Sequence, residues 1–435
     1  MDYAGALEYL AGHYDLERNP ATRSTRPDIS RITELMDVMG EPQRACPVVH
    51  VTGTNGKGST SRIIVELLTS MGLRVGGYAS PHLERVNERI TVANEPLSDD
   101  DFAEAVALVA TVEPMLTERW GRTATYFEVM AAAAYAWFAH TAVDVAVVEV
   151  GMGGTWDATN VADAAVAVVT NVARDHTDVL GDTLAAIAGE KAGIVKVGSH
   201  VVLGRMDEKL RDVFLSRPHE GEMVRGIDFD LTANSLAVGG RSLTLVTPTE
   251  KYEDVFLPLH GAHQGNNAAT AVAAVESLFG RPTPDEIVRE SLARVTAPGR
   301  FEIVGRSPLV VLDGAHNPAG AAAASLTLFE DFATTGRKVL VMGLNSPRDP
   351  VEMLEAFGAS RFDTIVATAP NWSRAVPADV VAESAAAFAP SVVWVPRVAE
   401  AVDRAVAEAG DDGVVLVSGS LYVVGEAREH LVTSL

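Results

Sequence analysis

The chain alternates short runs of Val, Ile and Ala with longer segments in which apolar residues recur at helical spacing. This alternation is typical of strand–helix–strand units built around a mostly parallel sheet. A strongly apolar helix face is expected just after residue 57, and an alanine-rich helix at 126–139. Apolar runs predict strands at 47–51, 144–150, 164–170, 309–312, 338–342, 364–367, 392–394 and 414–417. The pattern therefore predicts an α/β protein.

Two segments interrupt this regular pattern. Residues 222–258 contain short β-like pieces and turn residues, which predict a small antiparallel excursion at the edge of the first domain. The run Ala297-Pro298-Gly299-Arg300 predicts a hinge, because proline restricts the residue before it and glycine frees the chain after it. We expect a first domain at 1–296 and a smaller Rossmann-like α/β domain at 297–435.

Length and charge narrow the class of protein. The chain has 435 residues, enough for two or three domains. Its 35 basic and 58 acidic residues give a net charge of 35 − 58 = −23, which disfavours nucleic acid and anionic lipid as partners. The first ten residues carry Asp2 and Glu8 rather than a basic and apolar leader, and no apolar run approaches the roughly 20 residues of a membrane span. We expect a cytoplasmic enzyme without membrane or nucleic-acid partners.

A glycine-rich segment joins the first strong strand to the first strong helix. It reads Gly53-Thr54-Asn55-Gly56-Lys57-Gly58-Ser59-Thr60. Backbone N–H groups in such a loop, together with the helix N-terminus, can surround a polyphosphate, and Lys57 would lie against the outer phosphates. The general motif has Ser or Thr directly after the lysine, where this chain has Gly58. The alternative is a glycine turn with an exposed lysine.

Polar residues follow the next two strands. Glu149 ends an apolar strand, where nucleotide-binding sheets place a magnesium ligand, although a helix cap or an ion-pair partner is an equal alternative. Asp157 and Asn160 lie in the glycine-containing loop that follows. Asp175 and His176 follow the neighbouring strand, so ligands could converge at one sheet edge. His176 taken alone is more often an ordinary loop residue.

Two further positions are ambiguous from the residues alone. Lys191 follows a helical segment and reads as a solvated surface lysine. Asp313 and His316 follow an apolar strand and would lie at the edge of the second sheet, but a turn with a helix cap explains them equally well.

Taken together, the motifs resemble the folylpolyglutamate synthase and dihydrofolate synthase family of the Mur ligase superfamily. The resemblance runs nearly end to end, and the glycine after the loop lysine is a family feature. Its carriers are His50 to Ser59, Ser80-Pro-His-Leu83, Asn87-Glu-Arg-Ile90, Glu149 to Gly154, Asp157-Ala-Thr-Asn160, Asp175-His176, Glu190-Lys-Ala-Gly-Ile194, His263-Gln264 with Asn267, Pro298 to Glu302, Leu312 to Pro318 and Gly419-Ser-Leu-Tyr422.

The resemblance implies a P-loop central domain, a C-terminal glutamate-ligase domain and ATP-dependent ligation of L-glutamate to dihydropteroate or a reduced folate through an acyl phosphate. It implies that the protein uses ATP and two Mg²⁺ ions and that it is a monomer. It also assigns roles to single residues. Catalysis is assigned to Lys57, Lys191, Asp313 and His316, where Lys57 also contacts phosphate and Lys191 is carbamylated. Metal binding is assigned to Ser59, Ser80, Glu149, His176 and Lys191, nucleotide binding to Asn267, Arg300 and Asp313, and substrate binding to Asp157, His316 and Ser420.

One departure bears on the acceptor. Relatives commonly have Gly-Gly-Arg-Leu-Asp where this chain has Gly-Gly-Thr155-Trp156-Asp157, so a cationic contact near the pterin side is missing. Two rival functions remain. A Mur enzyme acting on a UDP-muramyl substrate is disfavoured because only 52 residues precede Gly53, and a regulatory P-loop ATPase would hydrolyse ATP without ligation.

Overall fold

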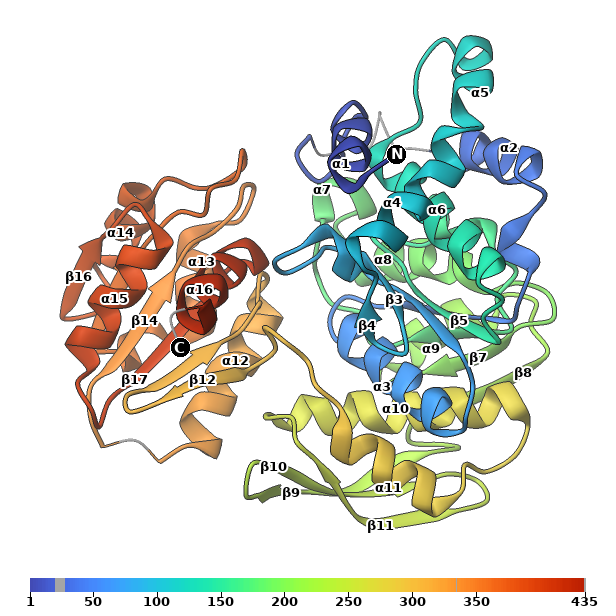
Figure 1. The fold of residues 1–435 in the computed structure, drawn as a ribbon. Helices are drawn as coiled ribbons and strands as arrows, with labels where there is room; N and C mark the ends of the chain where they lie inside the picture. Colours follow the sequence, from blue (N-terminus) through green and yellow to red (C-terminus); the bar gives the residue numbers. More distant parts are fainter. Residues whose placement is uncertain (20–27, 334, 434–435) are drawn as a thin grey trace. The chain divides into compact units, whose positions relative to one another are not determined.

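The computed structural model describes residues 1–19, 28–333 and 335–433, and the chain divides into two compact units (Figure 1). The first unit comprises residues 1–235, 242–258 and 264–295. The second comprises 236–241, 259–263 and 296–435. The chain passes into the second unit for the last time between Val295 and Thr296.

An eight-stranded sheet forms the centre of the first unit, in the order β4-β3-β2-β5-β1-β6-β7-β8. Neighbouring strands from β2 to β8 pair in parallel, and β3 and β4 add an antiparallel edge. The predicted strands at 47–51, 144–150 and 164–170 are confirmed as β1, β5 and β6. The bounds are β1 Val48–Thr52, β2 Val75–Tyr78, β3 Ile90–Val92, β4 Glu95–Pro96, β5 Val145–Glu149, β6 Val166–Val169, β7 His200–Leu203 and β8 Gly221–Val224.

Helices cover this sheet and contribute its core. The buried apolar residues of α1, α2, α4 and α6 form one cluster with sheet residues such as Val48 and Val148. The predicted alanine-rich helix is confirmed as α6, and its first turn is capped by Thr125. The bounds are α1 Tyr3–Ala11, α2 Ser30–Val38, α3 Lys57–Ser70, α4 Asp99–Ala110, α5 Glu113–Trp120, α6 Tyr126–His140, α7 Thr177–Leu180, α8 Leu184–Lys191, α9 Glu208–Leu215, α10 Ala262–Phe279 and α11 Asp285–Arg294.

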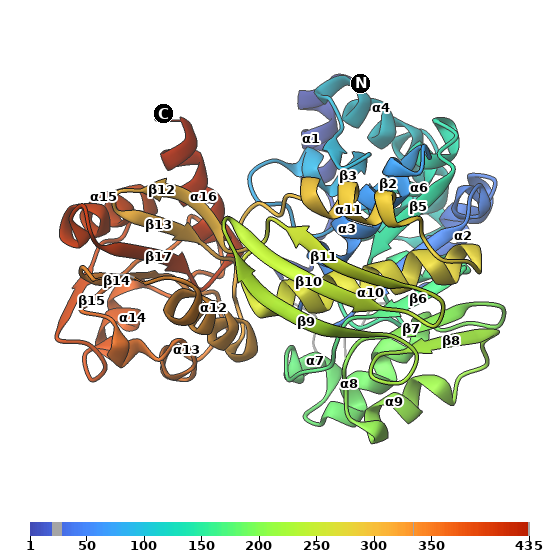
Figure 2. The same cartoon turned by 90° about the horizontal axis from the view of Figure 1, so that it is seen from below.

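The predicted antiparallel excursion at 222–258 is only partly correct. Its first piece is β8, which pairs in parallel with β7 and extends the main sheet. The remainder forms a separate three-stranded sheet, β9 Asp230–Ala237, β10 Gly240–Val246 and β11 Lys251–Leu257, with β10 in the middle (Figure 2). This small sheet packs against α10, since a side chain at Gly265 would meet Leu231 and Leu243.

The second unit is a smaller α/β sheet in the order β12-β13-β17-β14-β15-β16. All neighbours are parallel except β12 and β13, and the five predicted strands are confirmed as β13 to β17. The bounds are β12 Glu302–Arg306, β13 Leu309–Leu312, β14 Lys338–Met342, β15 Thr364–Ala367, β16 Ser391–Trp394, β17 Val414–Ser418, α12 Pro318–Asp331, α13 Pro350–Phe357, α14 Ala378–Ala385, α15 Val398–Ala409 and α16 Leu421–Thr433.

Within the described ranges, no helix combines the length and the apolar character that crossing a membrane requires.

Candidate functional site

The glycine-rich loop leaves the middle of the first sheet and runs directly into α3, which begins at Lys57. Two of its glycines are required by sterics. Gly56 has a φ of 83°, and an added Cβ would lie 2.5 Å from Oδ1 of Asn267. At Gly53 an added Cβ would lie 1.8 Å from Oγ1 of Thr170. The loop backbone is therefore closely packed against its neighbours.

The segment after β6 fixes the loop in place. The backbone N–H of Asn55 donates to Oδ1 of Asn171 at 3.0 Å, and Nδ2 of Asn171 donates back to the Asn55 carbonyl at 2.8 Å. The Thr54 hydroxyl donates to the carbonyl of Ala173 at 3.1 Å and accepts from its N–H at 3.0 Å. These reciprocal bonds hold the loop in a defined conformation. Neither Asn171 nor Ala173 was identified as functional from the sequence, because only the folded chain brings them to the loop.

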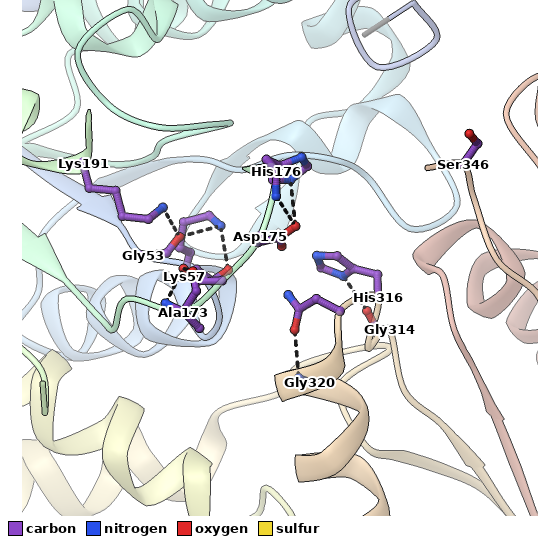
Figure 3. Close-up of polar contacts among 12 residues, drawn as sticks. Gly53, Lys57, Ala173, Asp175, His176, Lys191, Gly314, His316, Gly320 and Ser346 are labelled. Carbon is purple, nitrogen blue, oxygen red and sulfur yellow. Dashed lines mark hydrogen bonds and ion pairs between the residues drawn. The ribbon is translucent and has the colours of Figure 1, made fainter. Parts of the chain in front are cut away.

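Two lysines meet at one carbonyl of the loop. Nζ of Lys57 lies 3.1 Å and Nζ of Lys191 lies 2.9 Å from the carbonyl oxygen of Gly53, and both point toward it in Figure 3. Lys191 is the last residue of α8 and is only 4% exposed, so its interpretation as a surface lysine is wrong. Burial, followed by the positive charge of Lys57, lowers the pKa of Lys191 to about 7.

Oxygen donors lie at the start of α3. Ser59 is buried in its first turn, and the buried Glu149 ends β5. An added Cβ at Gly58 would lie 3.5 Å from Oε2 of Glu149, so the carboxylate faces the helix N-terminus. Hydroxyl and carboxylate oxygens suit Mg²⁺, which usually binds one or two carboxylates together with substrate phosphates. The described residues contain no group of three or more His, Cys, Asp or Glu side chains able to hold a metal.

The other metal-ligand candidates of the first unit lie after β2 and β6. The expectation that the strands before Glu149 and His176 are neighbours is wrong, because β1 lies between β5 and β6. Ser80 follows β2, which pairs with β5. His176 is the N-cap residue of α7 with a φ of 48°, and its N–H donates to Oδ1 of Asp175 at 2.7 Å (Figure 3). Asp175 is buried, whereas the side chain of His176 is 39% exposed. Thr54 and Ala173 link the segment carrying this pair to the phosphate loop.

Asp157 lies in the loop after β5, where it is buried and accepts several hydrogen bonds. Its carboxylate accepts from the Met152 N–H at 2.9 Å, and from the N–H and hydroxyl of Thr159 at 3.0 and 2.5 Å. Burial raises the pKa of Asp157, and these hydrogen bonds act in the opposite direction. Asp157 also lines a cavity with an aromatic and acidic wall, whose lining residues are Leu16, Asp28, Thr125, Phe127, Glu128, Trp156, Asp157 and Ala158.

The second unit gathers its own predicted residues after β13. The buried carboxylate of Asp313 accepts from the N–H groups of Phe301 and Ala315, each at 2.9 Å. Burial raises the pKa of Asp313 to about 6, although the charge of Arg300 opposes that shift. Nη1 of Arg300 contacts the Gly314 carbonyl at 3.5 Å.

The Gly314 carbonyl oxygen also contacts His316. Nδ1 of His316 lies 2.9 Å from the Gly314 oxygen, and Figure 3 shows this contact. The hydroxyl of the buried Ser420 accepts from Nδ2 of Asn345 at 2.8 Å and from the Tyr422 N–H at 3.2 Å. Arg300 and His316 therefore contact the same carbonyl oxygen. Ser420 lies between the end of β17 and the start of α16.

A phosphate loop with a strand-end carboxylate, followed by a separate α/β unit, defines the class of protein. Residues 51–275 match the Mur ligase middle domain, and residues 299–421 match the Mur ligase glutamate ligase domain. The chain is therefore a Mur-type ATP-dependent ligase.

Similar proteins narrow the class to one family. The chain is 38% identical to a dihydrofolate synthase/folylpolyglutamate synthase of Mycobacterium tuberculosis, over 95% of this chain and 91% of that protein. The corresponding Bacillus subtilis protein is 32% identical, over 93% of this chain and 95% of that protein. The chain belongs to the folylpolyglutamate synthase/dihydrofolate synthase family, and this confirms the resemblance seen in its motifs.

Solved structures agree with this assignment. A folylpolyglutamate synthase of M. tuberculosis complexed with ADP and AMPPCP superposes with a TM-score of 0.89 at 36% identity, covering 98% of both chains. The FolC protein of Escherichia coli in complex with DHPP and ADP has a TM-score of 0.86 at 30% identity, covering 100% of this chain and 98% of that one. The expected architecture, a P-loop α/β unit and a smaller Rossmann-like α/β unit, is confirmed.

Proposed function

We propose that this protein uses ATP and Mg²⁺ to join L-glutamate to the carboxylate of dihydropteroate, a reduced folate, or both. The observation that carries the proposal is the meeting of Lys57 and Lys191 at the Gly53 carbonyl, in a phosphate loop whose helix N-terminus faces Glu149. Related structures contain the same classes of small molecule: one holds DHPP and ADP, and another holds Mn, AMPPNP and L-glutamate.

The reaction requires activation, because a carboxylate is a poor electrophile. An oxygen of the acceptor carboxylate attacks the γ-phosphorus of ATP, the bond to ADP breaks, and an acyl phosphate forms. The amine nitrogen of glutamate then attacks the acyl carbon, the C–O bond to phosphate breaks, and the nitrogen loses a proton. We assign Lys57 and the N–H groups of residues 53–60 to the phosphate oxygens, where they neutralise the charge that develops.

Metal binding is assigned to the oxygen donors already described and to the imidazole of His176. We assign Ser59, Ser80, Glu149 and His176 to two Mg²⁺ ions, directly or through water. When bound, Mg²⁺ neutralises phosphate oxygens during transfer. The donor chemistry of Ser59 and Glu149 supports this assignment.

Lys191 is suited to carbamylation. CO₂ adds to a neutral amine, forms an N–C bond and releases a proton, so the lysine must first be deprotonated. With a pKa of about 7, roughly half of the Lys191 amines are neutral at pH 7. The modification would turn a buried cation beside Lys57 into an anion able to bind Mg²⁺, which removes the repulsion between two ammonium groups.

We assign the remaining residues by their positions in the family motifs. Asn267, against Gly56, contacts the adenine side of the nucleotide, and Arg300 with Asp313 contacts the phosphates. His316 and Ser420 bind the incoming glutamate, and Asp157 binds the acceptor. We further propose functional domains at residues 1–296 and 297–435, a monomeric state and a cytoplasmic location.

We place the acceptor beside Asp157, next to a small aromatic and acidic cavity of about 30 Å³. Its wall contains Phe127 and Trp156, which offer flat apolar surface, and carboxylates that can accept from ring N–H groups. Thr155 stands where relatives have arginine, and its hydroxyl donates to the Glu190 carbonyl at 3.1 Å. An acceptor that depends on that arginine would bind less tightly here.

The test is the substrate dependence of ADP release. Purified protein with Mg-ATP should release ADP rapidly only when L-glutamate and either dihydropteroate or a reduced monoglutamyl folate are both present. Comparing the two acceptors then distinguishes dihydrofolate synthesis from tail extension. ADP release that ignores both additions would support a regulatory ATPase instead, and activity with a UDP-muramyl substrate alone would also refute the proposal.

A further inference from the structure

A buried hydrogen-bond relay runs from the central strand to Asp157. Oγ1 of Thr159 donates to Oδ1 of Asp157 at 2.5 Å, and Nε2 of His50 lies 2.8 Å from the same hydroxyl. Thr159 and His50 are both 0% exposed, and Asp157 is 3% exposed. His50 and Thr159 are therefore shielded from bulk water, and Asp157 nearly so.

The relay has a defined direction. The Thr159 hydroxyl gives its single proton to Asp157, so it can only accept from His50, and Nε2 of His50 must carry a proton. Nδ1 of His50 is buried without a hydrogen-bond partner among the described residues, which suits the unprotonated nitrogen of a neutral ring. Burial lowers the pKa of His50 to about 3, which keeps the ring neutral.

The same strand holds the loop on the other side of Asp157. Alternate residues of a strand face the same side of a sheet, so His50 and Thr52 both face the loop after β5. The Thr52 hydroxyl donates to the Gly153 carbonyl at 2.9 Å. The loop is thus attached to β1 four residues before Asp157 and two residues after it, and β1 continues directly into the phosphate loop.

We propose that His50 and Thr159 are positioning residues for the acceptor: through their hydrogen bonds they fix the Asp157 carboxylate that contacts it. This inference rests on the proposed function, since it takes Asp157 to bind the pteroate or folate. It adds that one strand, β1, sets the position of the acceptor relative to the phosphate loop. The relay would act on acceptor binding and not on the chemistry of ATP.

The experiment compares Thr159→Val, which keeps the shape but removes the hydroxyl, with Thr159→Ser, which keeps the hydroxyl. Steady-state KM values are measured for the acceptor, ATP and L-glutamate. We expect Thr159→Val to raise the acceptor KM about tenfold, because a hydrogen bond to a charged group is lost. The KM values for ATP and L-glutamate should stay within about twofold, and Thr159→Ser should restore the acceptor KM.

A second pair of variants, at His50, provides the test if the Thr159→Val variant does not fold. His50→Gln retains a neutral N–H donor of similar reach, whereas His50→Leu removes it, so only the leucine variant should raise the acceptor KM. An unchanged acceptor KM in the folded valine or leucine variant overturns the inference, as does an equal rise in all three KM values. If the wild-type protein ligates glutamate to neither acceptor, the proposed function fails first and the inference fails with it.

Discussion

Gly58 offers the sharpest test of the proposed metal position. It is the second residue of α3, and an alanine Cβ there would meet only Oε2 of Glu149, at 3.5 Å, an ordinary van der Waals distance. Gly58→Ala therefore fits without strain. Replacing a helical glycine by alanine should stabilise the fold by about 0.5–1 kcal/mol, because the unfolded chain loses conformational freedom.

The same methyl group covers one side of the carboxylate that we assign to Mg²⁺. We expect the apparent affinity for Mg²⁺ to fall about tenfold, a loss typical of altered surroundings at a metal ligand and equal to about 1.4 kcal/mol. We thus expect Gly58→Ala to unfold at a higher urea concentration than the wild type and to require more Mg²⁺ for activity. Urea unfolding measures the first effect, and initial ligation rates titrated with free Mg²⁺ at saturating ATP measure the second.

Gly189→Ala is the matched control. Gly189 lies in α8, and its added Cβ would meet nothing within 4 Å, so it gains helix propensity without touching Glu149. It should show a similar rise in stability and an unchanged Mg²⁺ requirement. An identical Mg²⁺ dependence in Gly58→Ala, Gly189→Ala and the wild type would refute the placement of the metal beside Glu149.

Three further substitutions test other parts of the site. Gly56→Ala combines a φ of 83° with a Cβ 2.5 Å from Asn267 Oδ1, so it should destabilise the protein by at least about 1–2 kcal/mol in urea and raise the KM for ATP. Lys191→Ala should abolish ligation, with partial recovery when short carboxylates are added; full activity without them would exclude the carbamate. Asp313, with its pKa raised to about 6, keeps a proton that the unfolded chain releases near pH 4, so its contribution to the unfolding free energy should fall by about 3 kcal/mol as the pH rises from 4 to 7. Asp313→Asn should remove that fall in urea titrations across this pH range, and an unchanged slope would contradict the shift.

Elements could be predicted from the sequence where their own residues show a clear pattern. The apolar run of β1, the glycine-rich loop and the helical spacing of α3 lie next to one another in the chain, so their order predicts a phosphate site. Glu149 was proposed as a metal ligand for the same reason, since it ends a continuous apolar strand. At these positions the order of elements along the chain and the family motifs led to the same prediction.

Residues placed by packing could not be found in this way. Lys191 is buried because the end of α8 packs against the loop after β5, where an added Cβ at Gly154 would lie 3.1 Å from the Lys191 Cα. Nothing in its neighbouring residues encodes that contact. β12 was missed because it is an antiparallel edge strand without a continuous buried face, and β8 was assigned to the wrong sheet because only one of its four residues is buried.

The central position of β1 has a consequence for how the protein fluctuates. β1 is hydrogen-bonded to β5 on one side and β6 on the other, three or more strands from either sheet edge. Its amides can exchange with deuterium only when most of the sheet opens, whereas those of β4 and β8 can exchange through fraying of the margin. The backbone that anchors the phosphate loop should thus be among the slowest-exchanging parts of the first unit.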